Sequence, residues 1–251
     1  MIRDIEFRQV RPEGVLAPFV DSFWMLRNRS DEGKHVIGLP DGRIDLFFSR
    51  SGSEPYNVMA LGINTQPDKA VIEPDTVMFA VSFKLPATEY ILRFPVADIV
   101  NAVKVLPDDM WGFNADILQD FDVFCSRVAK QILSLLPEER DERKHKLFDL
   151  IYTSKGEVTV GWLSAQVFWS ARQINRYFDK QFGISLSAYC KILRFRASLE
   201  HIARGQLFPE LNFTDQSHFI KEIKKFSGTI PKELFKNQND RFILLSAIRQ
   251  L

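Results

Sequence analysis

Cysteine and histidine are scarce in this chain of 251 residues, which holds two of the former and four of the latter. Cys125 and Cys190 lie far apart and predict no disulfide framework, so we expect two reduced thiols. A protein metal site needs clustered histidines, cysteines or carboxylates, yet only His35 lies in the first half of the chain. We therefore expect no metal and no other cofactor.

Long apolar runs and the common signatures of catalysis are missing as well. No stretch of about 18 apolar residues occurs, which excludes a membrane-spanning helix. The first ten residues, MIRDIEFRQV, lack the basic and then apolar plan of a secretory signal, so we expect a cytoplasmic protein. The sequence shows no Ser-His-Asp arrangement and no glycine-rich phosphate loop, and we expect no enzyme.

The chain is rich in apolar side chains, and its charge is unevenly distributed. Hydrophobic residues make up 45% of it and 22 residues are phenylalanine, enough for one large or two small cores. Residues 1–140 hold 15 lysines and arginines against 21 acidic residues, whereas residues 141–251 hold 18 against 11. A basic half beside an acidic half hints at a nucleic-acid-binding portion.

Residues 1–94 predict β-strands. The segment VIGLPDGRIDLFFSR has two apolar runs with a Pro-Asp-Gly turn signal between them, and YNVMALGIN and AVIEPDTVMFAVSFKL continue the pattern. Short strands at this spacing favour a sandwich or a small barrel. Six aromatic residues of this half either belong to its core or line an apolar pocket: Trp24, Phe47, Phe48, Phe79, Phe83 and Trp111.

The period changes at Pro95, and residues 95–136 predict helices because apolar residues recur there at spacings of three and four. The longest apolar stripe comprises Ile117, Leu118, Phe121, Phe124, Val128, Ile132 and Leu135. It is longer than one sheet face needs, so we expect the segment 113–136 to pair two subunits. The charged run after Pro137 predicts a seam between a domain of residues 1–140 and one of residues 141–251.

Residues 145–236 predict short helices separated by glycine, serine and proline. The expected ranges are 148–152, 158–168, 170–182, 187–203, 214–228 and 231–235. In SARQINRYFDKQFGIS, Arg172, Asn175 and Arg176 share the face opposite to the apolar stripe. A helix, a tight turn and such a second helix are typical of a helix-turn-helix unit, in which Arg suits guanine and Asn suits adenine. A solvated surface helix is the other interpretation.

The stretch FTDQSHFIKEIKKFSG predicts a further helix with a polar and basic face. Thr214 or Asp215 can cap its start, and Gly228 suits a left-handed end. Its apolar stripe comprises Phe219, Ile223 and Phe226. Lysines on the outer face suit phosphates, and the amide and hydroxyl groups suit base edges, although a solvated helix has the same pattern.

Together these segments resemble the C-terminal DNA-binding domain of AraC-type (arabinose-operon regulator) transcription factors. The resemblance covers residues 145–236 and runs through LSAQVFWSARQINRYFDKQFGISLSAYCKILRFRASLEHI and NFTDQSHFIKEIKKFSGTIPKEL. The positions in register are Ser170, Arg176, Phe178, Gly183, Ser185, Tyr189, Arg194, Ala197, Asp215, Gln216, Ser217, Phe219, Gly228 and Pro231. It implies an all-α domain of two helix-turn-helix units joined by a long helix, and thus an α+β fold for the chain.

The resemblance also implies which side chains contact DNA. With neighbouring polar and basic positions, the expected set is Ser170, Arg172, Gln173, Asn175, Arg176, Gln216, Ser217, His218, Lys221, Lys224 and Lys225. The family often has Arg where Lys221 stands, and only GQLFPELNFT, with Pro209 inside it, fills the place of the second brace helix. The second unit is therefore atypical, and we expect the first unit to supply most of the sequence specificity.

The N-terminal half resembles, less specifically, the sensor domains that precede this DNA-binding domain, which are often cupin-like barrels followed by helices that pair two subunits. The resemblance implies a bacterial-type regulator that binds promoter double-stranded DNA as a homodimer. An unidentified small-molecule effector and RNA polymerase are the further partners it suggests. Two other functions stay open. One is a partner-binding module without specific DNA binding, and the other is a DNA-repair methyltransferase, which needs a cysteine nucleophile.

Overall fold

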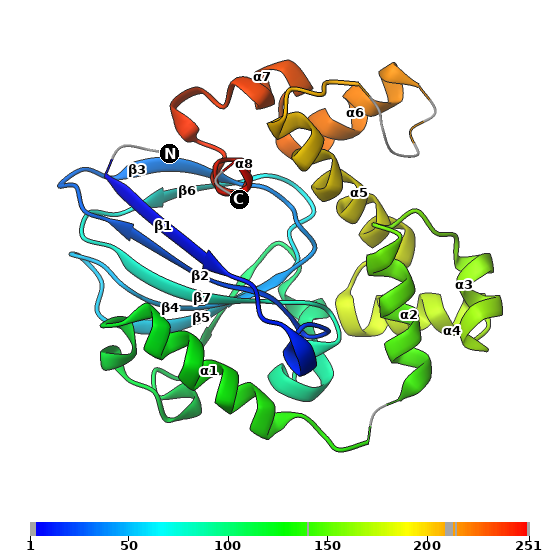
Figure 1. Ribbon diagram of the computed structural model, residues 1–251, viewed down its shortest axis with the longest axis horizontal. Helices are drawn as coiled ribbons and strands as arrows, with labels where there is room; N and C mark the ends of the chain where they lie inside the picture. Colours follow the sequence, from blue (N-terminus) through cyan, green and yellow to red (C-terminus); the bar gives the residue numbers. More distant parts are fainter. Residues whose placement is uncertain (1–3, 140, 209–212, 214, 250–251) are drawn as a thin grey trace.

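The computed structural model is an α+β protein, as expected, with antiparallel strands in its N-terminal part and helices in its C-terminal part (Figure 1). It describes residues 4–139, 141–208, 213 and 215–249. Within these ranges, no helix is long and apolar enough to cross a membrane.

Six strands form one antiparallel sheet in the order β1-β2-β7-β4-β5-β8, and two more form a separate pair, β3-β6. The six are β1 (Ile5–Val10), β2 (Val20–Asn28), β7 (Val77–Phe83), β4 (Ile44–Arg50), β5 (Asn57–Leu61) and β8 (Val103–Leu106). The pair consists of β3 (Lys34–Gly38) and β6 (Asp68–Ile72). The strands thus lie in two sheets, and a closed cupin-like barrel remains an expectation.

The central strands send alternate residues to opposite faces of the large sheet, as the period of two requires. In β4, Ile44, Leu46 and Phe48 are buried on one face. There α1 (Phe121–Leu135) packs across the sheet, with the Phe124 ring 5.5 Å from the ring of Phe48 (Figure 1). This contact between helix and sheet forms the main core of the N-terminal part.

The apolar stripe that we expected to pair two subunits is covered within the chain. Ile117, Leu118 and Phe121 are each at most 4% exposed, and the rest of the stripe up to Ile132 is fully buried. The stripe also spans two elements, because the turn η5 (Ala115–Leu118) ends before Asp120 caps α1. A pairing surface built from these side chains would require α1 to leave the sheet.

The predicted helices after Pro95 are only partly present. The segment holds the short turns η3 (Val96–Ile99) and η4 (Met110–Gly112), with β8 between them, whereas the turn η2 (Thr88–Leu92) ends before Pro95. β8 pairs with β5 as an edge strand, with Leu106 opposite Val58. The sequence Val-Lys-Val-Leu contains two β-branched valines, so it suits the open edge of β5. Residues 95–136 are therefore not all helical.

The Pro-Asp-Gly signal does not form a hairpin, because β3 and β4 on either side of it belong to different sheets. It carries the chain from one sheet to the other. Gly42 has a φ of +74°, and a Cβ there would lie 2.9 Å from the ring of Tyr189. Glycine is thus required twice over, for the left-handed turn and for the close approach of helix α5 (Leu186–Ala203).

The other helices are α2 (Glu142–Thr153), α3 (Val160–Val167), α4 (Ala171–Phe182), α6 (Gln216–Ser227), α7 (Pro231–Lys236) and α8 (Ile243–Ile248). Most follow the predicted ranges. α2 is longer and begins in the charged run after Pro137, because Asp141 caps it by accepting from the amide of Arg143 at 3.0 Å. Two further turns are η1 (Gly14–Leu16) and η6 (Gln238–Asp240).

The helix α8 returns to the N-terminal part, where Figure 1 shows it beside β3 and β6. The amide of Ile37 in β3 donates to the carbonyl of Arg241 at 2.6 Å, just before α8. Phe242 and Leu245 are buried there. Both parts of the chain consequently contribute to one continuous hydrophobic core.

Candidate nucleic-acid interface and internal cavity

The first candidate interface is formed by α3 and α4, which are joined by a short turn. Phe168 ends α3 in a left-handed conformation, with a φ of 54°. Ser170 then starts α4 with a capping box: its hydroxyl accepts from the amide of Gln173 at 3.2 Å, and Gln173 Oε1 accepts from the amide of Ser170 at 2.8 Å. Two of the expected DNA contacts thus already cap the helix, which holds α4 in a defined direction relative to α3.

The outer face of α4 carries the other expected contacts of the first unit. Ile174, Phe178 and Phe182 are buried on its inner face. Arg172, Asn175 and Arg176 are exposed, and within the described residues their side chains have neither a hydrogen-bond partner nor an ion-pair partner. This face therefore offers two guanidinium groups and an amide to solvent or to a ligand.

In the second unit, Asp215 caps α6 by accepting from the amide of His218 at 2.8 Å, while Thr214 lies outside the described residues. Gln216 donates to the carbonyl of Leu207 at 3.2 Å. The ring of His218 packs 5.6 Å from that of Phe213. Five expected contacts are exposed on α6, namely Gln216, Ser217, Lys221, Lys224 and Lys225. Gln216 and His218 also contact the segment that precedes α6.

The place of the second brace helix is described only in part. Residues 205–208 are not helical, whereas Pro209 and residues 210–212 lie outside the described ranges, so the expectation of a shortened brace stays a prediction. Figure 1 shows α4 and α6 near opposite ends of α5. α5 has 18 residues and is therefore about 27 Å long at 1.5 Å per residue. That length is somewhat shorter than one turn of B-DNA, roughly 34 Å.

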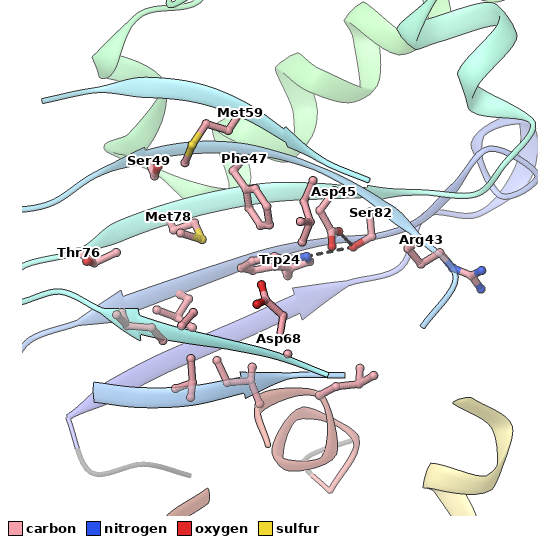
Figure 2. A pocket seen from close by; sticks show the side chains of 18 of the residues that line it. Trp24, Arg43, Asp45, Phe47, Ser49, Met59, Asp68, Thr76, Met78 and Ser82 are labelled. Atoms are coloured by element: carbon pink, nitrogen blue, oxygen red, sulfur yellow. Dashed lines mark hydrogen bonds between the residues drawn. The ribbon is translucent and has the colours of Figure 1, made fainter. Parts of the chain in front are cut away.

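A cavity of about 440 Å³ lies between the large sheet and the β3–β6 pair (Figure 2). The sheet lines it with the residues that alternate with the core, among them Trp24, Phe47 and Met78. α8 lines it with Ile243, Leu244 and Ala247. A cavity of this size can hold a small molecule.

The six aromatic residues for which the sequence allowed either a core position or a pocket position fall into two groups. Trp24 and Phe47 line it, with ring centroids 5.5 Å apart. Phe48, Phe79 and Phe83 are fully buried in the core on the other face of the sheet. Trp111 packs against Phe48 at 6.4 Å and also belongs to the core side. The five residues on strands differ in the face of the sheet to which they point, whereas Trp111 lies in η4.

Asp45 is the most unusual polar residue of the cavity. The hydroxyl of Ser82 donates to its carboxyl group, and the indole of Trp24 donates to the hydroxyl of Ser82 at 3.0 Å (Figure 2). Burial, reinforced by the negative charge of Asp41, raises the pKa of Asp45 to about 7. Asp45 therefore changes its protonation near neutral pH.

Asp21 joins the cavity to the helical part. It accepts from Arg43 at 2.9 Å and from Arg196 of α5 at 2.7 Å. Nearby, Tyr189 of α5 donates to the carbonyl of Gly42 at 3.0 Å. Burial alone would raise the pKa of Asp21, but the two guanidinium groups outweigh it and hold that pKa below its ordinary value. The long helix is thus attached to the sheet by buried polar contacts.

Sequence reasoning missed the polar residues of the cavity and its α8 wall. One signal was available: in RIDLFFSR, a carboxylate interrupts an apolar strand at the same parity as Phe47. The contribution of α8 had no local signal, because residues 241–248 are brought to the sheet only by the path of the whole chain.

A family model described as a domain of unknown function (DUF6597) matches residues 8–104, which hold all eight strands except the ends of β1 and β8. The match covers less than half of the chain. A search of curated proteins found no match.

Solved structures of ToxT from Vibrio cholerae are similar to this chain at low identity. A structure at 1.65 Å resolution is 11% identical, covers 93% of this chain and 98% of its own, and has a TM-score of 0.43. ToxT bound to (E)-4-(8-methylnaphthalen-1-yl)but-3-enoic acid is 13% identical, covers 97% and 100%, and has a TM-score of 0.45.

Proposed function

We propose that the chain is a sequence-specific DNA-binding transcription regulator of the AraC type, with an effector-sensing part in residues 1–140 and a DNA-binding part in residues 141–251. The observation that supports it is the pair of capped, outward-facing basic helices, α4 and α6, near opposite ends of α5 (Figure 1). The long helix α5 would then set the spacing of the two helices along the duplex. Promoter DNA is the proposed partner, RNA polymerase a further one, and the cavity is the proposed effector site.

The test is a binding measurement on the duplex upstream of the chain's own gene, with a salt titration and a scrambled duplex as control. We expect the upstream duplex to bind more tightly and the affinity to fall with salt, because phosphate contacts release counterions. Equal affinity for both duplexes would favour the partner-binding module. The absence of any binding would remove the DNA-binding function.

The two thiols argue against the alternative of a DNA-repair methyltransferase. Burial raises the pKa of Cys125 to about 11, and burial raises the pKa of Cys190 to about 11 as well. A nucleophilic cysteine reacts as its thiolate and therefore needs a lowered pKa. Protonated, half-buried or buried thiols fit a structural role in α1 and α5.

The two recognition helices are expected to differ in what they read. Arg176→Ala should relax base preference at one defined position, because a bidentate Arg contact contributes roughly 1–3 kcal/mol of discrimination. Lys224→Ala should weaken binding to all sequences and reduce the salt slope by about one unit. Selection of binding sites from a random pool with each variant measures both effects. Lys69→Ala, an exposed lysine in β6, is the control. An unchanged preferred site for Arg176→Ala would contradict this division.

The protein is also proposed to act as a homodimer, because two copies double the DNA contact. Sedimentation equilibrium at micromolar concentration should then give twice the chain mass of 29.0 kDa. Substitutions in the buried stripe, such as Leu118→Glu, are unsuitable as controls because they would disrupt the packing of α1. A monomer across this concentration range would remove pairing from the proposal.

A further inference from the structure

The charge of the cavity wall is predominantly negative. Six acidic residues and three arginines line it. Two of the arginines, Arg43 and Arg196, are already paired with Asp21, and Figure 2 shows Arg43 directed away from Trp24 and Asp45. The third, Arg50, is exposed and lies five residues beyond Asp45 along β4, which is about 17 Å. An anionic ligand beside Asp45 would therefore meet carboxyl groups without a guanidinium group to balance it.

An aromatic wall stands among these carboxyl groups. Trp24 stacks on Phe7 at 6.2 Å and meets Phe47 edge to face at 5.5 Å. On one side of the indole lies Asp45, connected to it through Ser82. From the opposite wall, Asp68 of β6 points its carboxylate toward the indole (Figure 2). Trp24 thus has an acidic side chain on either side of it.

We propose that this cavity binds a small organic cation, an amine or quaternary ammonium group on an apolar body, with the charged nitrogen beside Trp24 and between Asp45 and Asp68. Indole faces attract such cations, and the two carboxylates supply opposite charge. The apolar body would lie against Met78, Leu244 and neighbouring side chains. This inference names a ligand class for the effector site. Only the role of the ligand as an effector rests on the proposed function, and the binding itself does not.

Protonation of Asp45 should be linked to this binding. Since its pKa is raised to about 7, an arriving cation favours the carboxylate and displaces its proton. The charged groups that line the cavity on this side are Asp21 of β2, Asp41 and Arg43 before β4, Asp68 of β6 and Arg196 of α5. None of the arginines among them is hydrogen-bonded to Asp45 in the described part of the chain. The affinity for a cation should accordingly be about tenfold lower at pH 6 than at pH 8.

The experiment compares three probes of one shape by calorimetric titration of the full chain without DNA. They are (para-hydroxyphenyl)trimethylammonium, its neutral carbon isostere para-tert-butylphenol, and the anion para-tert-butylbenzoate. We expect the cation to bind at least tenfold more tightly than the neutral isostere, and the anion to bind most weakly. Equal binding of cation and isostere, tighter binding of the anion, or no binding of the cation would each overturn the proposal.

Variants locate the effect. Asp45→Asn should reduce the preference for the cation over the neutral isostere to within about threefold, and it should abolish the dependence of cation affinity on pH. Asp68→Asn, at an exposed position that tolerates an amide, should reduce that preference but leave the dependence on pH unchanged. Asp149→Asn, an exposed carboxylate on α2, is the matched control and should change neither. An unchanged preference in both cavity variants would place the cation elsewhere. Because DNA is absent, failure here leaves the DNA-binding test unaffected, and the reverse holds too.

Discussion

Asp21→Ala is expected to destabilise the folded chain by about 3–5 kcal/mol, because it leaves the guanidinium of Arg43 buried without its partner. The side chain of Arg43 is only 3% exposed, and that of Asp21 only 13%. The same carboxylate holds Arg196 of α5, so its loss also loosens the long helix from the sheet. Urea denaturation of wild type and variant measures the difference in the free energy of unfolding.

The matched control is Asp122→Ala, which removes the carboxylate of an exposed ion pair with Arg8. Exposed pairs contribute about 0–1 kcal/mol, so this variant should stay close to wild type. A loss for Asp21→Ala no larger than that for Asp122→Ala would mean that the buried network does not stabilise the junction.

The contribution of Asp21 should also depend on pH in a defined direction. Its folded-state pKa is depressed below the ordinary value near 3.9. Its stabilising effect is therefore present above that ordinary value and is lost as the pH falls toward the folded-state pKa. The difference between wild type and Asp21→Ala should be constant from pH 5 to pH 8, at roughly the size given above, and should shrink in acid. A difference that grew in acid would contradict this assignment.

Phe124→Ala is expected to cost about 3–5 kcal/mol as well, because it removes a large buried ring and leaves a cavity. Phe124 is fully buried, and its ring lies 5.4 Å from Phe79 and 5.5 Å from Phe48. It thus joins α1 to two strands of the sheet. Thermal and urea denaturation, followed by circular dichroism, measure the loss.

Leu133→Ala on the same helix is its control, because Leu133 is 46% exposed and should change the free energy of unfolding by less than about 0.5 kcal/mol. Similar losses in both variants would mean that the outer face of α1 is covered by a second subunit in solution. That result would support pairing through α1 while leaving its inner stripe in the core.

The features that the sequence predicted well are local ones. The ranges of α4 and α6, the caps at Ser170 and Asp215 and the left-handed ends at Gly183 and Gly228 depend on a few neighbouring residues, and short-range chemistry decides them. The outward face of α4 follows from the period of the helix in the same way. Whether these faces bind DNA remains a prediction.

The features that it did not predict depend on partners distant in the chain. Val103 to Leu106 form a strand because the edge of β5 is available for pairing. The sheet that covers the stripe of α1 is built from several strands, so no single segment of the sequence predicts that contact. Asp45 lies near Trp24 only because β7 pairs with both β4 and β2 and so lies between them in the sheet. Alternation in β4 indicated a face for Asp45 but not what lies across from it.

The return of α8 to the sheet has a consequence for how the protein is made. A chain synthesised from its N-terminus can pair its strands early, since domains generally fold as they emerge. The cavity, however, lacks part of its wall until Ile243, Leu244 and Ala247 of α8 leave the ribosome, after α2 to α7. A chain released too soon would carry a sheet with an open cavity, so the ability to hold a ligand should appear only in copies that also contain both candidate recognition helices.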